Sequence, residues 1–161
     1  MKRLVALFCL IFCVILGGCT PHTDHLAPLR GDFEADISGE MNGVAFSALC
    51  QRETDENGGV WLTVTFYAPT SLADTVAKRA PDGTIALSVG ELTVSAVPEG
   101  LSSLFDLLSP TGEVTGSALT EEGHTKVTGN GFAVTFLADG SPYLLENTAA
   151  KATVIRFAAV E

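Results

Sequence analysis

The chain has 161 residues, of which 19 are acidic and 9 are basic, so its formal net charge is −10 at pH 7. The acidic excess excludes a nucleic-acid-binding protein, because phosphate backbones are bound by clustered Lys and Arg. It also argues against broad adhesion to anionic lipid head groups, and the length suits one domain with a core of its own.

The first 18 residues have the organisation of an export signal. Lys2 and Arg3 form a positive segment, and the apolar run from Leu4 to Leu16 is too short to span a membrane comfortably. Gly17, Gly18 and Cys19 follow, and small residues before a cysteine are what lipoprotein signal peptidase requires. We therefore expect cleavage before Cys19 and acylation of that cysteine, including palmitate. The alternatives are an ordinary signal peptide with an incidental cysteine and a retained transmembrane anchor.

Cleavage at this site would change the charge and cysteine count. Removing 18 residues from 161 leaves 143, with 7 basic and 19 acidic side chains. Cys9 and Cys13 would leave with the signal and Cys19 would carry lipid, so Cys50 remains alone and no intrachain disulfide can form. Cys50 falls on an apolar strand face, which favours a buried packing residue over a reactive thiol. Residues 19–31 are interpreted as a polar, lipidated tether.

The first β-hairpin is the most readable feature of the folded part. Asn42-Gly43 is a strong signal for a type I′ turn, whose central residues both take positive φ. Pairing outward from this turn places apolar residues on one face and Glu, Asp, Ser and Gln on the other, which predicts a sheet with one wet side. The predicted apolar pairs are Met41 with Val44, Gly39 with Phe46, Ile37 with Ala48, and Ala35 with Cys50.

Further alternating segments follow at short spacings. The last of them, 152–160, places Thr153, Ile155 and Phe157 on the opposite face from Val154 and Arg156. Asn130-Gly131 is a second type I′ signal. Short connections make the strands antiparallel, and we expect about nine. The segments are 60–68, 75–79, 84–89, 92–97, 114–119, 125–129, 132–137, 143–146 and 152–160.

One segment has the period of a helix instead. Between Gly100 and Ser109, apolar residues recur at i, i+3, i+4 and i+7, and Pro110 ends the pattern. A helix this short is marginal in isolation. We therefore expect it to lie as a lid on the apolar face of the sheet.

The sequence lacks a constellation that would support catalysis. His22 and His25 lie in the tether, where no rigid geometry could hold a metal ion, and His124 lies in a turn. Neighbouring acidic residues such as Glu121 and Glu122 also lie in turns, where solvated charge is the ordinary explanation. We expect no enzyme activity, no catalytic residues, no metal site and no cofactor.

The predicted fold is mainly β: a curved antiparallel sheet forming an unclosed half-barrel with a short lid helix. A twisted sheet with one apolar face curls around that face. The concavity is either filled by the chain's own side chains or left hollow for an acyl chain, and the sequence leaves both open. The division is a signal peptide at 1–18, the tether at 19–31 and a β domain at 32–161.

Several short motifs support this fold. Asp32-Phe33 leads the first hairpin, Val64-x-Phe66-x-x-Pro69-x-x-Leu72 follows, and Asp82-Gly83-Thr84-Ile85 and Asp139-Gly140-Ser141-Pro142 come later. Over residues 32 to 160 this run resembles the LolA/LolB/LppX-like superfamily of lipoprotein carriers and receptors. The resemblance implies an unclosed antiparallel barrel with helices in its concavity and non-catalytic binding of acyl chains. The chain departs from the family in lacking a long helix before the first strand and in its short lid helix.

Our leading hypothesis is therefore a membrane-anchored, extracytoplasmic lipoprotein that binds a lipid or another apolar ligand. The alternative is a tethered module that docks an envelope protein, has a filled core and presents a patch around Trp61 and Tyr67. In the leading hypothesis, acylated Cys19 anchors the chain to the membrane. The ligand-binding site is lined by Phe33, Ile37, Phe46, Leu62, Val64, Phe66, Leu101, Leu104, Phe105 and Leu108.

Overall fold

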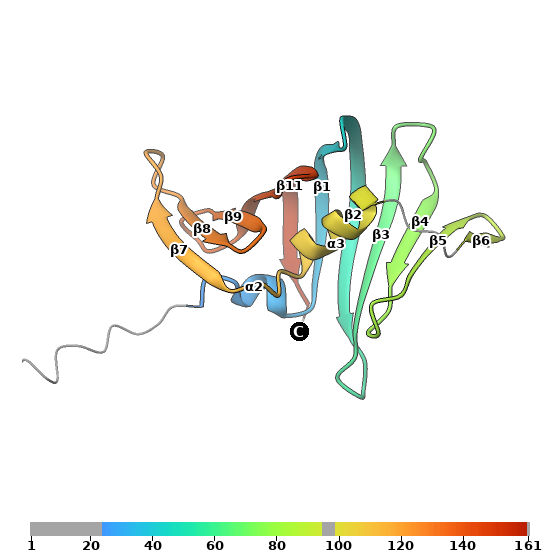
Figure 1. Cartoon of the computed structure of the whole chain (residues 1–161), viewed down its shortest axis with the longest axis horizontal. Coiled ribbons are helices and arrows are strands. Elements are labelled where there is room, and N and C mark those ends of the chain that lie inside the picture. Colours follow the sequence, from blue (N-terminus) through green and yellow to red (C-terminus); the bar gives the residue numbers. More distant parts are fainter. Residues whose placement is uncertain (1–23, 95–98, 161) are drawn as a thin grey trace, which may run out of the picture.

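The computed structural model describes residues 24–94 and 99–160, so the expected signal and Cys19 lie outside the described residues. The fold is one antiparallel sheet with two short helices on one face (Figure 1). The strands are β1 (Phe33–Met41), β2 (Val44–Thr54), β3 (Val60–Ala68), β4 (Thr75–Arg79), β5 (Ile85–Val89), β6 (Leu92–Val94), β7 (Val114–Leu119), β8 (Thr125–Gly129), β9 (Phe132–Phe136), β10 (Pro142–Glu146) and β11 (Ala150–Ala159).

The sheet consists of two meanders joined at the first and last strands. Its order is β6-β5-β4-β3-β2-β1-β11-β10-β9-β8-β7, so consecutive strands are neighbours within each meander. The single long-range junction is β1 against β11. β6 and β7 are the outermost strands, which leaves the described sheet unclosed (Figure 1). This confirms the mainly β, unclosed fold class. The described sheet has eleven strands, which are the two of the first hairpin and the nine further segments, against a predicted total of about nine.

The first hairpin has the predicted register. Met41 lies opposite Val44 and Ala35 opposite Cys50. Asn42 and Gly43 have φ values of 49° and 79°, as a type I′ turn requires. The second predicted type I′ turn was wrong: Gly131 has positive φ, whereas Asn130 is not among the non-glycine residues with positive φ. One flexible residue is enough to close that two-residue loop.

The last strand departs from simple alternation. Its register against β1 shifts between Asp36 and Ile37, where Asp36 pairs with Arg156 and Ile37 with Val154. The extra residue is Ile155, and such a bulge places two neighbouring side chains on the same side. Val154 and Phe157 therefore both pack against the core, and the predicted grouping of Ile155 with Phe157 was wrong.

Two helices cover the concave face. α3 (Glu99–Leu108) matches the predicted helix closely and contacts β1, β10 and β11 in the middle of the sheet (Figure 1). α2 (Ala27–Arg30) lies within the segment interpreted as tether, and Leu26 and Leu29 beside it are buried in the core. Folded structure thus begins upstream of residue 32. Within residues 24–94 and 99–160, no helix combines the length and apolar character needed to cross a membrane.

An ion-pair cluster on the wet face links the C-terminal strands. The Glu146 carboxylate lies 3.0 Å from Lys151 Nζ and 3.4 Å from Lys126 Nζ. The hydrogen bond from Lys151, helped by the positive charges of both lysines, holds the pKa of Glu146 below its ordinary value of 4.5, against the opposing effect of partial burial. The folded state therefore favours the charged form of this carboxyl.

The Glu146 cluster predicts a pH-dependent contribution to stability. Because the folded pKa lies below the unfolded one, the contribution is present above about pH 4.5 and disappears as pH falls through the folded value. Glu146→Gln should lower the free energy of unfolding by about 0.2–1 kcal/mol at pH 7, with a smaller difference at pH 3. Urea unfolding at both pH values measures this, with Glu121→Gln in an exposed turn as the control. Equal differences at the two pH values would contradict it.

Candidate binding site

The middle of the concave face contains all ten predicted ligand-lining residues. They come from β1, β2, β3 and α3, and each is only 0–3 % exposed. All ten belong to one core cluster, together with side chains of β9, β10 and β11. Side chains lining a water-sized cavity would retain accessible surface, so these ten residues pack against protein.

α3 fills the concavity because of its apolar stripe. The stripe points at the sheet and consists of Leu101, Leu104, Phe105 and Leu108. Leu107, which does not belong to the predicted stripe, is also fully buried. Glycine at position 100 permits this close approach, since a Cβ there would lie 2.8 Å from Met41 Cγ. The helix is therefore part of the core as well as its cover.

Two arginines at the margin of this core were missed by the sequence analysis. Arg52 is buried, and its Nη1 lies 3.1 Å from Asp32 Oδ1, while its Nε has no hydrogen-bond partner within the described structure. Arg79 Nη1 lies 2.9 Å from Asp106 Oδ1, and its guanidinium sits 5.6 Å from the Phe105 ring centroid. The register that put Cys50 on the inner face also puts Arg52 there, so strand parity could have identified it.

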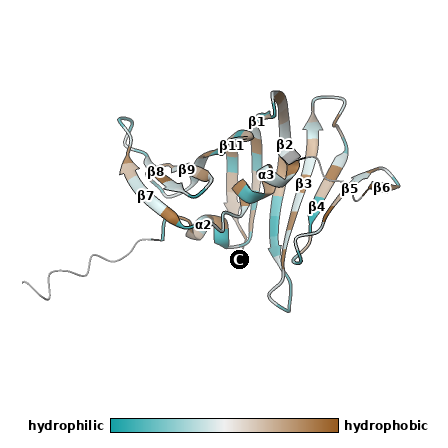
Figure 2. Ribbon diagram, in the orientation of Figure 1, coloured by the Kyte–Doolittle hydropathy of each residue, from teal (hydrophilic) through white to brown (hydrophobic). Residues whose placement is uncertain are grey.

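Residues 24–94 and 99–160 leave the two ends of the concave face uncovered. Beyond α3, the inward-facing positions of β5 and β6 hold Val89, Leu92 and Val94, all exposed. At the opposite end, β7 exposes Val114 and Leu119. Figure 2 shows hydrophobic residues on both outer strands. Exposed apolar groups therefore occur at the ends of the sheet, whereas its middle is sealed.

The residues proposed for a patch on the wet face do not lie together. Trp61 and Tyr67 are both exposed, at 41 % and 53 %, on the outward side of β3. Six residues along a strand separate them by roughly 20 Å. Trp61 Nε1 also donates a hydrogen bond to Asp55 Oδ2 at 3.3 Å, which attaches the indole to its own turn. Each is a separate exposed aromatic residue.

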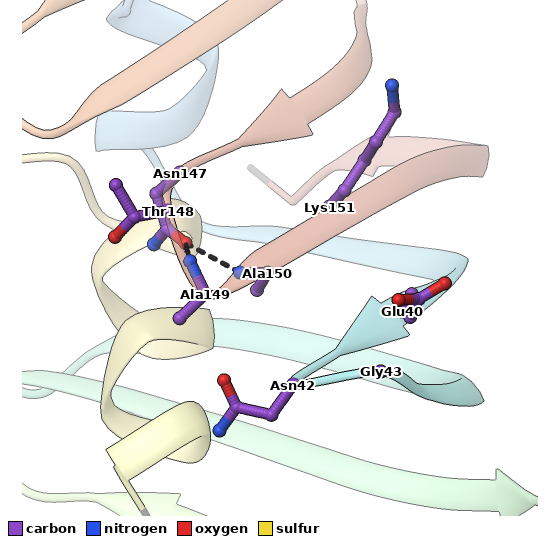
Figure 3. Close-up of a pocket in the computed structure, with 8 residues that line it drawn as sticks. All are labelled: Glu40, Asn42, Gly43, Asn147, Thr148, Ala149, Ala150 and Lys151. Atoms are coloured by element: carbon purple, nitrogen blue, oxygen red, sulfur yellow. Dashed lines mark hydrogen bonds between the residues drawn. The ribbon is translucent and has the colours of Figure 1, made fainter.

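A surface depression of about 270 Å³ lies where two turns meet (Figure 3). Asn147 Oδ1 accepts hydrogen bonds from the backbone N–H groups of Ala149 and Ala150, at 2.9 and 2.7 Å. Its Nδ2 donates to the Ser103 carbonyl on α3, at 2.9 Å. The polar atoms of Asn147 are thus engaged in holding the β10–β11 turn and α3 together, which is a structural role.

Two titratable groups that the sequence analysis singled out, Cys50 on β2 and His124 in the turn between β7 and β8, have different surroundings. Cys50 is a free, buried cysteine, as predicted, and burial raises the pKa of its thiol, which keeps it protonated. His124 is half-buried with its ring 5.5 Å from that of Tyr143. Among residues 24–94 and 99–160, no group of three or more His, Cys, Asp or Glu side chains could hold a metal ion.

Comparison with known proteins identifies the fold alone. No protein-family model matches the chain, and no curated protein sequence matches it. The crystal structure of MucB is similar with a TM-score of 0.54 and 15 % sequence identity, over 89 % of this chain and 60 % of MucB. The chain therefore spans about 60 % of the length of that protein.

Two further solved structures are similar at lower scores. An uncharacterized conserved protein from Thermus thermophilus has a TM-score of 0.47 and 12 % identity, over 84 % of this chain and 83 % of that one. A Pseudomonas aeruginosa MucA/MucB complex contributes a chain with a TM-score of 0.42 and 17 % identity, over 85 % of this chain and 56 % of that one. The similarity to MucB shows that the two proteins share a fold, and the unclosed antiparallel sheet that the sequence resemblance implied is confirmed.

Proposed function

We propose that the chain is a non-catalytic, lipid-anchored domain on the extracytoplasmic side of the cell membrane that binds a partner protein of the envelope. The export signal and Cys19 in the sequence support the anchoring. The unclosed LolA/MucB-like fold supports a binding role.

We favour a protein partner because the ten residues predicted to line a lipid site are buried. At 0–3 % exposure they contact one another and the rest of the core. An acyl chain in the middle of the concavity would have to displace α3, whose five large apolar side chains are fully buried there. Each buried side chain of this kind contributes about 1.5–3 kcal/mol, so displacement would be costly.

An apolar ligand remains a second candidate because of the uncovered end at β5 and β6. Val89, Leu92 and Val94 face inward there and are exposed. An acyl chain lying on this end could bury them without moving α3.

Native mass spectrometry of the full chain, extracted from a bacterial membrane in mild detergent, tests this function. We expect a polypeptide that starts at Cys19, carries covalent acyl groups and retains no further lipid. Cys19→Ser is the control for anchoring, and it should abolish both the acyl mass and membrane fractionation.

Different outcomes separate the two candidates. If the wild-type chain retains stoichiometric non-covalent lipid and the Leu92→Glu variant does not, the function is lipid binding at the β5–β6 end and the proposed function is wrong. A wild-type chain that begins at Met1, or that lacks acyl groups at Cys19, would contradict the anchoring.

A further inference from the structure

The two outer strands differ in how well they are protected against pairing with another strand. β6 spans three described residues, since residues 95–98 that follow it lie outside the described part of the chain, and a short edge strand offers little template. β7 has six residues, Val114 to Leu119, without a charged residue or proline. Lysine, proline, shortness and bulges are the usual means by which proteins blunt an edge. The register of β7 against β8 shifts between Val114 and Gly116, but the segment from Gly116 to Leu119 pairs regularly and has neither lysine nor proline.

Backbone groups of β7 are directed away from β8. The Thr120 N–H donates to the His124 carbonyl at 2.8 Å, and Leu119 pairs with Thr125. Since hydrogen-bonded and non-hydrogen-bonded pairs alternate along antiparallel strands, the N–H and C=O groups of Ser117 and Leu119 face the outer edge. These are the groups that an added strand would bind.

The side chains of β7 extend the apolar concave face beyond the core. Leu119 is 77 % exposed and pairs with Thr125, which in turn pairs with the buried Phe136. Val114 is also exposed and pairs with Gly129, next to Phe132. An added strand with apolar residues on its inner side would therefore bury Leu119 and Val114 and continue the core outward.

Acidic residues flank this edge at both ends and limit what can pair with it. Glu113 precedes the strand, and Glu121 and Glu122 follow it, all exposed. Antiparallel pairing of β7 with a second copy would bring Glu113 of one chain beside Glu121 and Glu122 of the other, and like charges across strands are destabilising. A strand with basic residues at its ends would instead form attractive pairs.

We infer that the β7 edge accepts an extended segment of a partner protein as an additional strand, with alternating apolar residues between basic ends. The inference rests on the proposed function and specifies the surface and the chemistry of the partner. Backbone hydrogen bonds give affinity in this mode, and the flanking charges give selectivity.

The test measures binding of two synthetic peptides to the full-length lipoprotein in detergent micelles. Both alternate threonine and valine, one between pairs of lysines and the other between pairs of glutamates. By fluorescence anisotropy at low salt, the lysine peptide should bind at least about tenfold more tightly, and the difference should shrink as salt is raised. Hydrogen exchange should show new protection at Ser117 and Leu119.

Three variants locate the binding edge. Ser117→Pro removes an outward N–H and should weaken binding of the lysine peptide at least about tenfold. Leu119→Glu tests the same edge without a backbone change. Leu92→Glu is the matched control, since Leu92 is 74 % exposed on the other outer strand, and it should leave peptide binding unchanged.

The inference would be overturned if neither Ser117→Pro nor Leu119→Glu weakened binding, or if the two peptides bound equally. It would also be overturned by a concentration-dependent dimer that Ser117→Pro dissociates, because a second copy would then occupy the edge. Failure of the proposed function gives a different signal, namely stoichiometric lipid in the native mass spectrum.

Discussion

Replacing Phe105 by alanine is expected to lower the free energy of unfolding by about 3–5 kcal/mol. Phe105 is fully buried at the centre of α3, among the apolar side chains of the sheet, and its ring lies beneath the Arg79 guanidinium. The substitution removes this packing and leaves a cavity, because the surrounding strands can relax only partly. A loss of this size is a large fraction of the roughly 5–15 kcal/mol typical of a domain.

Urea unfolding followed by the fluorescence of Trp61, the chain's one tryptophan, measures this loss. Leu119→Ala is the control: it also shortens a large apolar side chain, but one that is 77 % exposed, and should change stability by less than about 0.5 kcal/mol. A loss below about 1 kcal/mol for Phe105→Ala would mean that α3 is not part of the core. The sealed concavity, and the argument against an internal acyl chain, would then fail.

Replacing Gly39 by alanine should destabilise the junction between the two meanders by about 3 kcal/mol or more. Gly39 pairs with Ala152 across the β1–β11 boundary. A Cβ at this position would overlap the carbonyl oxygen of Lys151 and lie 2.7 Å from Ala152 Cα. Both contacts are with backbone, so the strands themselves would have to separate.

Gly116→Ala provides the comparison for this substitution. Gly116 also lies in a strand, but the nearest atom to its added Cβ would be Thr128 Oγ1 at 3.7 Å, an ordinary contact. We expect a change of less than about 0.5 kcal/mol, measured by thermal and urea unfolding. Equal effects at Gly39 and Gly116 would show that the β1–β11 approach is not as close as the structure has it.

Much of the local structure could be predicted from sequence pattern. Asn42-Gly43 fixed the register of the first hairpin, because a one-residue slip would have turned Ile37 and Cys50 to the wet face. The stripe from Leu101 to Leu108 located α3, since only a helical period gathers those residues on one side. The bulge at Ile155 could not be predicted, because alternation continues through it in the sequence and the irregularity exists only against β1.

The candidate site divides in the same way. Sequence pattern identified the residues of the concave face, and the structure places all ten of them in one core. The sequence analysis did not predict that Arg52, Leu26 and Leu29 are buried, because the burial of each depends on contacts with distant segments. Arg52 is held by Asp32, and Leu26 and Leu29 pack in a core built mostly from residues later in the chain.

By itself, the sequence determined the strands, most of their inner faces, the helix and an acidic surface, because hydrophobic period and turn residues act over a few neighbours. Tertiary structure alone decided that β1 pairs with β11, that α3 fills the concavity and that β7 is an outer strand of the described sheet. Those outcomes depend on which distant surfaces meet and how completely they exclude water. No local pattern encodes that choice, since many pairings of the same strands would bury similar apolar faces.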